Sequence, residues 1–99
     1  MKISTLLLAA VAGIALATPV AAQSRGSVCV VADPTGTLLN VRTAPNGRVV
    51  GQIANGVWVR VGDMAADNGK PWAFIHDSDM TGTRGDPLGW VFARYLNCR

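Results

Sequence analysis

Short runs rich in apolar residues, several of which alternate with polar residues, recur along the chain beyond its first 27 residues. In the clearest run, residues 57–61, three valines alternate with Trp58 and Arg60. A period of two is typical of a strand with one buried face, so we expect the valines in the core and Trp58 at least partly exposed. Other short runs, alternating or rich in β-branched and aromatic residues, predict further strands at residues 28–31, 38–42, 49–53, 72–76 and 89–92.

Turn-forming residues separate these runs. Pro45-Asn46-Gly47 follows the run at residues 38–42, and Asn55-Gly56 precedes the run at residues 57–61. Asn-Gly accepts the positive φ of tight turns, and the ring of proline fixes its own φ at a value that suits a turn. We therefore predict two consecutive hairpins over residues 38–61.

The other segments are polar or short. Residues 62–71 and 77–88 are rich in Asp, Asn, Thr and Gly, and both are predicted to be loops. Residues 93–96 are expected to form a single helical turn, and the run at residues 28–31 is expected at an edge of the sheet. Five or six short antiparallel strands spaced about ten residues apart indicate an all-β fold, either a small barrel or a sandwich. We favour the barrel, because closure leaves few unpaired strand edges.

The first 22 residues have the pattern of a signal peptide. Lys2 is followed by an apolar stretch of Leu, Ala, Val and Ile, and small residues precede a cleavage site predicted between Ala22 and Gln23. The apolar stretch is shorter than the roughly 20 residues of a spanning helix, so we favour cleavage over a membrane anchor. Residues 23–27 are then a flexible lead-in, no membrane span remains after cleavage, and the protein is expected to be periplasmic or secreted.

The charge of the mature chain is small. Without Lys2, eight Lys and Arg stand against six Asp, a net charge of +2, and the basic residues are scattered. Nucleic-acid binding proteins concentrate basic residues in a patch or stripe. We therefore expect no nucleic-acid partner.

Several motifs in order resemble the bacterial SH3-like (SH3b) domain. They are Leu39-Asn40-Val41-Arg42, Ala44-Pro45, Val50-Gly51-Gln52-Ile53, Asn55-Gly56, Trp72, Gly89-Trp90-Val91 and Tyr95-Leu96. The resemblance covers about residues 28–96 and implies a single SH3-like barrel domain at residues 28–99. It departs from the family at residues 77–88, which are longer than the tight hairpin usual there.

The resemblance implies a binding module and no catalysis. Its ligand would be peptidoglycan or a cell-wall peptide; the alternative is an accessory or inhibitory module that docks on another exported protein. Trp72 and Tyr95 stand where such domains often build an aromatic groove, and Asn40 and Arg42 flank it. Packing alone is an equal explanation for Trp72, and Arg42 could serve only to pin the loop at residues 43–48. Trp58 is a further candidate binding residue, suited to a protein interface, and a monomer is expected.

The chain ends lie close together in this barrel type, so the resemblance also implies a disulfide between Cys29 and Cys98, the only cysteines. Export to an oxidising compartment favours it. The alternatives are two free thiols or an intermolecular bridge.

No cofactor, metal or catalytic residue is predicted. His76 is the only histidine and is expected at a strand end facing solvent, since a thiol hydrolase would need a free thiolate beside it. Residues 77–82 place acids at alternate positions like the start of a calcium loop. Leu88 stands where such a loop needs a bidentate Glu, so we interpret the segment as a solvated turn.

Overall fold

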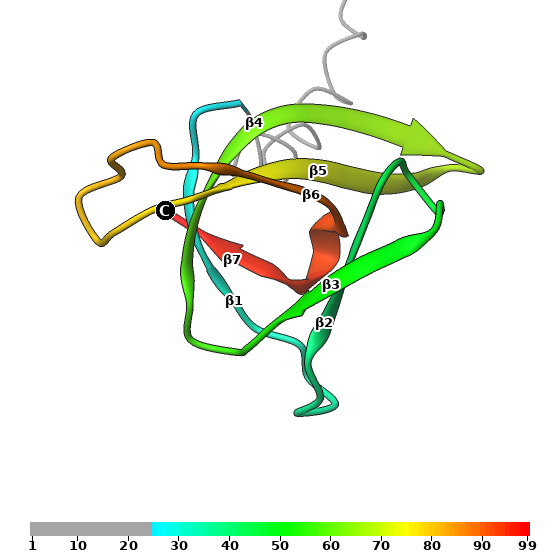
Figure 1. The fold of residues 1–99 in the computed structure, drawn as a ribbon, viewed down its shortest axis with the longest axis horizontal. Helices are drawn as coiled ribbons and strands as arrows, with labels where there is room; N and C mark the ends of the chain where they lie inside the picture. Colours follow the sequence, from blue (N-terminus) through cyan, green and yellow to red (C-terminus); the bar gives the residue numbers. More distant parts are fainter. Residues whose placement is uncertain (1–24) are drawn as a thin grey trace, which may run out of the picture.

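The computed structural model describes residues 25–99, so the predicted signal peptide and the first two residues of the lead-in lie outside the described residues. Within residues 25–99, seven antiparallel strands form one sheet in the order β3-β2-β6-β5-β4-β1-β7. The sheet curls around a common interior (Figure 1). The elements are β1 (Val28–Val31), β2 (Leu39–Arg42), β3 (Val49–Ile53), β4 (Trp58–Asp67), β5 (Lys70–Asp77), β6 (Pro87–Phe92), the 3₁₀ turn η3 (Ala93–Tyr95) and β7 (Leu96–Cys98).

The prediction of an all-β fold with one helical turn near the C-terminus is confirmed. The strand count exceeds the predicted five or six, because the chain continues past η3 into β7, which pairs with β1. This last strand is three residues long, too short for an alternation pattern to reveal it.

The core is formed by the inward-facing residues of the alternating runs, as expected for a half-buried sheet. Most are small or β-branched aliphatic side chains, which suit the narrow interior of a small barrel. Val57, also predicted in the core, is partly buried and packs against it. The buried cluster consists of Cys29, Val31, Leu39, Val41, Val59, Val61, Ala73, Ile75, Val91, Ala93 and Leu96.

The predicted loop at residues 62–71 is wrong, because β4 continues to Asp67 and β5 begins at Lys70. Asn68 (φ 52°) and Gly69 (φ 75°) both have the positive φ of a two-residue type I′ hairpin. The hydrogen-bonded pairing of β4 with β5 outweighs the low strand propensity of Asp and Ala in this segment. The β4–β5 hairpin therefore projects as a long arm beside the barrel (Figure 1).

The first predicted hairpin is confirmed and the second is wrong. β2 and β3 pair across the turn at Ala44–Gly47, where Gly47 N–H donates to Ala44 O at 2.8 Å. β3 and β4 are not neighbours in the sheet. Asn55 instead binds the end of β1, since its Oδ1 accepts from Asp33 N–H at 2.7 Å.

The predicted edge position of β1 is also wrong, since β1 lies between β4 and β7. Cys29 and Cys98 are directly paired in the β1–β7 register. They form the predicted disulfide, with Cα atoms 4.0 Å apart. Because 69 positions separate the two cysteines, the bridge joins the two ends of the barrel domain. In this part of the chain, no helix has the length and apolar character to cross a membrane.

Candidate functional site

Four aromatic residues occupy the outer face of β5 and β6. Inward-facing Ala73, Ile75 and Val91 are fully buried, so their neighbours along the strands point outward. In the β5–β6 register Trp72 lies opposite Phe92 and Phe74 opposite Trp90, with ring centroids 5.7 and 5.6 Å apart. Such cross-strand aromatic pairs stabilise a sheet and leave ring faces on its surface.

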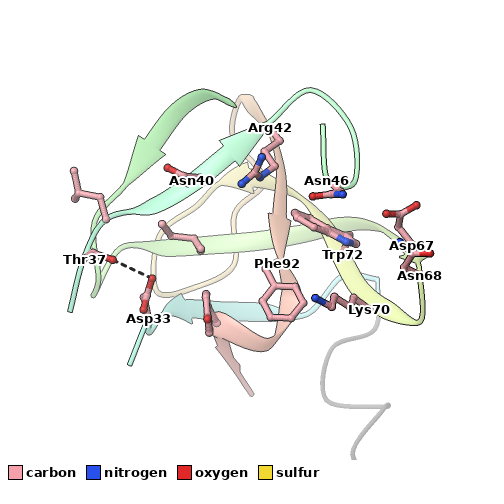
Figure 2. Close-up of a pocket in the computed structure, with 13 residues that line it drawn as sticks. Asp33, Thr37, Asn40, Arg42, Asn46, Asp67, Asn68, Lys70, Trp72 and Phe92 are labelled. Carbon is pink, nitrogen blue, oxygen red and sulfur yellow. Dashed lines mark hydrogen bonds between the residues drawn. The ribbon is translucent and has the colours of Figure 1, made fainter. Parts of the chain in front are cut away.

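A groove of about 340 Å³ opens along one end of this aromatic face. Its floor consists of Trp72, Phe92 and Tyr95, and Tyr95 packs edge-on to Phe92 at 5.2 Å between ring centroids. Three segments form its walls, as Figure 2 shows. They are the β1–β2 connection (Asp33, Thr37, Leu38), strand β2 with its turn (Leu39, Asn40, Arg42, Asn46) and the tip of the β4–β5 hairpin (Asp67, Asn68, Lys70).

The structure brings together four of the five predicted binding residues: Trp72, Tyr95, Asn40 and Arg42 line this groove. Trp58 does not, because it lies on β4, where it is paired with Val30 of β1. Its ring is half-buried, and the Arg99 guanidinium lies over it at 4.6 Å from the centroid.

The hairpin residues of the wall escaped the sequence prediction. Asp67, Asn68 and Lys70 fall in the segment predicted to be a loop, and only the pairing of β4 with β5 carries them to the groove. Asn68-Gly69 was the available signal, since a two-residue turn places its flanking residues opposite each other. Phe92 could have been found from its alternation with Trp90.

Arg42 has two structural contacts in the groove wall. Its Nη1 donates to Gly47 O at 2.8 Å, which ties the β2–β3 turn to the strand. Its guanidinium also lies 5.9 Å from the centroid of the Trp72 ring, within the range of a cation–π contact. Arg42 thus holds the turn and covers Trp72 at the same time.

Trp72 contains a buried donor without a partner. The residue is only 7% exposed although it lies on the outer face of the sheet. Among residues 25–99, Trp72 Nε1 is the one buried side-chain nitrogen or oxygen with no hydrogen-bond partner. Leaving such a donor unsatisfied costs about 1–3 kcal/mol, so its presence calls for an explanation.

The groove has charges of both signs on its walls. Asp33 and Asp67 are acidic, and Arg42 and Lys70 are basic. Hydrogen bonds from the Thr35 hydroxyl (2.6 Å) and the Thr35 backbone N–H (2.8 Å) hold the pKa of Asp33 below its ordinary value. The groove can therefore bind a ligand that has an apolar part and charged groups.

The prediction that His76 faces solvent is wrong, since the residue is only 6% exposed. Its ring packs edge-on to Phe74, and its Nε2 lies 3.2 Å from Arg84 Nη2. A guanidinium can only donate, so Nε2 accepts, and Nδ1 carries the hydrogen that Gly85 O accepts at 3.3 Å. His76 thereby fastens the β5–β6 loop to the sheet. Since both cysteines are in the disulfide, neither provides a thiolate beside this histidine.

Residues 77–82 do not gather metal ligands. No group of three His, Cys, Asp or Glu side chains suited to a metal occurs within residues 25–99. Asp79 Oδ1 instead accepts from the Thr81 hydroxyl at 2.6 Å and from the Thr81 and Thr83 backbone N–H groups at 2.9 and 3.2 Å. Asp79 is exposed, as the prediction of a solvated turn requires.

We expect these hydrogen bonds to make stability depend on the charge of Asp79. The Thr81 hydroxyl is the largest cause that lowers the pKa of Asp79 from its ordinary value of 3.8. Because the pKa is lower in the folded state, the ionised Asp79 carboxylate adds to the free energy of unfolding. This contribution is fully present above pH 3.8 and is lost as the pH falls through the folded-state pKa. Asp79→Asn should therefore lose less stability than the wild type between about pH 5 and about pH 3.

Urea midpoints at the two pH values measure this difference. Asp86→Asn removes an exposed charge from the same loop and is the control. An equal loss of stability in Asp79→Asn and the wild type would contradict the role assigned to Asp79.

Comparisons of this chain with protein-family models, with curated proteins and with solved structures give no match, so the resemblance to SH3-like domains stays a prediction from the sequence.

Proposed function

We propose that the protein is a non-catalytic, SH3-like binding module of the bacterial envelope, and that its groove binds peptidoglycan through a cell-wall stem peptide. The observation that supports this function best is the combination of an aromatic floor with acidic and basic walls in one groove. Stem peptides carry carboxylates, amines and short aliphatic side chains, which match those three surfaces. The volume of about 340 Å³ is at the lower end of small-ligand sites, suited to a few residues of such a peptide.

The disulfide supports the location that this function requires. Disulfides persist in oxidising compartments such as the periplasm and the extracellular medium. The pattern of residues 1–22, typical of a signal peptide, agrees with export to one of these compartments.

A pull-down of the oxidised protein on purified sacculi at low and high salt tests the proposal. We expect retention at both salt concentrations, because the aromatic floor does not depend on screened charges. Tyr95→Ala removes one ring of the floor and should weaken retention about tenfold, the effect of a significant interface side chain. Trp58→Ala is the matched control, since Trp58 is also a half-buried aromatic residue but lies outside the groove.

Thermal unfolding of both variants establishes that each is folded at the temperature of the assay. Retention that disappears at high salt would mean that the positive net charge adheres to an anionic polymer, against specific recognition. Unchanged retention of Tyr95→Ala would remove the groove as the binding site.

A second candidate is docking on another exported protein, and the free edge of the sheet favours it. Among the strands of residues 25–99, β3 has a partner on one side only, and its Val49 and Val50 are 43% and 51% exposed. An exposed apolar edge strand can accept an additional strand from a partner. Co-purification of one stoichiometric protein after removal of the cell wall, lost on Val50→Lys, would support this function over the first.

A further inference from the structure

The unpaired indole N–H of Trp72 lies at one end of the groove. Trp72 is more than nine-tenths buried, and its Nε1 has no acceptor among residues 25–99. Figure 2 shows the nitrogen-bearing side of the ring directed towards the tip of the β4–β5 hairpin, where Asp67 and Asn68 lie. An N–H can only donate, so the group that completes this site must offer an oxygen or another acceptor.

The charges around the Trp72 ring favour an anionic acceptor. The Arg42 guanidinium lies 5.9 Å from the ring centroid. Lys70 is two positions before Trp72 on β5, so both side chains lie on the same face of the strand. Of the acids among residues 25–99 that line the groove, only Asp67 lies in this half, and it lies opposite Lys70 in the hairpin register. Two cations against one anion leave this end positive, whereas Asp33 lies at the other end of the groove.

The surroundings of the donor can rearrange to admit a ligand. Nε1 is shielded from water in the free protein, so neighbouring side chains must move before an oxygen reaches it. Asn68 and Lys70, which border this end of the groove, are exposed. Exposed side chains change rotamer within picoseconds to nanoseconds, which does not require the sheet to open.

We propose that the Trp72 end of the groove binds the carboxylate of a peptide ligand, with Trp72 Nε1 donating a hydrogen bond to it and Lys70 supplying the opposing charge. This inference rests on the proposed function and specifies which group of the cell-wall peptide enters the groove. It also sets the direction of the ligand, since the carboxylate end lies under the β4–β5 hairpin and the rest of the peptide extends towards Asp33.

The test compares two forms of one synthetic stem peptide, with a free C-terminal carboxylate and with a C-terminal amide. A ¹⁵N-labelled sample resolves the indole N–H signals of Trp58, Trp72 and Trp90, which tryptophan-to-phenylalanine variants assign. We expect the free acid to move the Trp72 signal downfield while the Trp58 signal stays in place. The amide should bind about tenfold more weakly, because a hydrogen bond to a charged group is stronger than one to a neutral group.

Two variants and one control separate the contributions of Lys70 and Trp72. Lys70→Gln should weaken binding of the free acid about fivefold, the upper range for an exposed ion pair, and leave binding of the amide unchanged. Arg48→Gln is the control. Arg48 is exposed, immediately precedes β3 and lies outside the groove, so this variant should bind both peptides as the wild type does. Trp72→Phe keeps an aromatic ring and leaves Lys70 in place but removes the donor, so it should bind both peptides more weakly and retain only the preference for the acid that Lys70 supplies.

Equal binding of acid and amide to the wild type, with the Trp72 signal displaced by both, would overturn the carboxylate assignment and leave the proposed function standing. Binding that displaces other signals but not Trp72 would overturn the assignment of the donor. Failure of both peptides to bind, together with loss of sacculus retention, would overturn the proposed function and this inference with it.

Discussion

Opening the Cys29–Cys98 disulfide is expected to lower the free energy of unfolding by about 4 kcal/mol. The bridge closes a loop of 69 positions, and a cross-link over a loop of that length strongly reduces the entropy of the unfolded chain. Domains of this size have only about 5–15 kcal/mol of total stability, so this one bond supplies a large share of it. The bridge also holds the three-residue strand β7 against β1.

Urea unfolding of the oxidised and the reduced wild-type protein measures this effect without any change in sequence. A Cys29→Ala/Cys98→Ala variant then adds the loss of packing at Cys29, which is fully buried. We expect the double variant to be at least as destabilised as the reduced protein. Coincident urea midpoints for the oxidised and reduced proteins would show that the cross-link contributes nothing.

Gly89→Ala is expected to destabilise strongly the pairing of β2 with β6, two of the strands that carry the groove. An added Cβ would lie 2.7 Å from Val41 Cγ1 and 2.8 Å from Arg42 O. Arg42 O is a backbone atom and cannot turn away, so β2 and β6 must separate. The φ of +142° at Gly89 is also unfavourable for any residue with a side chain. Together we expect a loss of about 2–4 kcal/mol.

Gly51→Ala is the matched control for this substitution. Gly51 is also a strand glycine, but no atom of the described residues lies within 4 Å of its added Cβ and its φ is not positive. We expect a change within about 0.5 kcal/mol. Thermal and urea unfolding of both variants, with sacculus binding for whichever is folded, gives the measurement. Similar stability of the two variants would contradict the close approach of β2 and β6.

The clearest difference between prediction and structure concerns the β4–β5 hairpin. Its residues 62–67 have the composition of a loop, and nothing local marks them as a strand. Residues 63–67 are extended because each pairs with a residue of β5, and Gly62 lies at the irregularity in the register between Val61 and Asp63. Only the folded hairpin supplies these contacts. The groove depends on the same event, since Lys70 and Asp67 reach the wall only when the hairpin forms.

At Asn55-Gly56 the sequence predicted the turn correctly but not which strands are neighbours. The dipeptide correctly indicated a turn, and Gly56 has a positive φ of 88°. A turn signal does not say which strands become neighbours. β3 ends at Ile53, and the chain then crosses to the end of β1, where Gly56 N–H donates to Val31 O at 2.9 Å. The order of strands in a sheet is a non-local property and is decided by the packing of the whole core.

The sequence by itself determined the properties that depend on neighbouring residues. Alternation of apolar and polar residues placed most of the strands and their buried faces, and Asn, Gly and Pro marked the turns. With only two cysteines in the chain, one intramolecular pairing was available. Tertiary structure decided the strand order, the burial of His76 and the gathering of Asn40, Arg42, Lys70 and Trp72 into one groove. These side chains come from strands separated along the chain, and only the curled sheet brings them together.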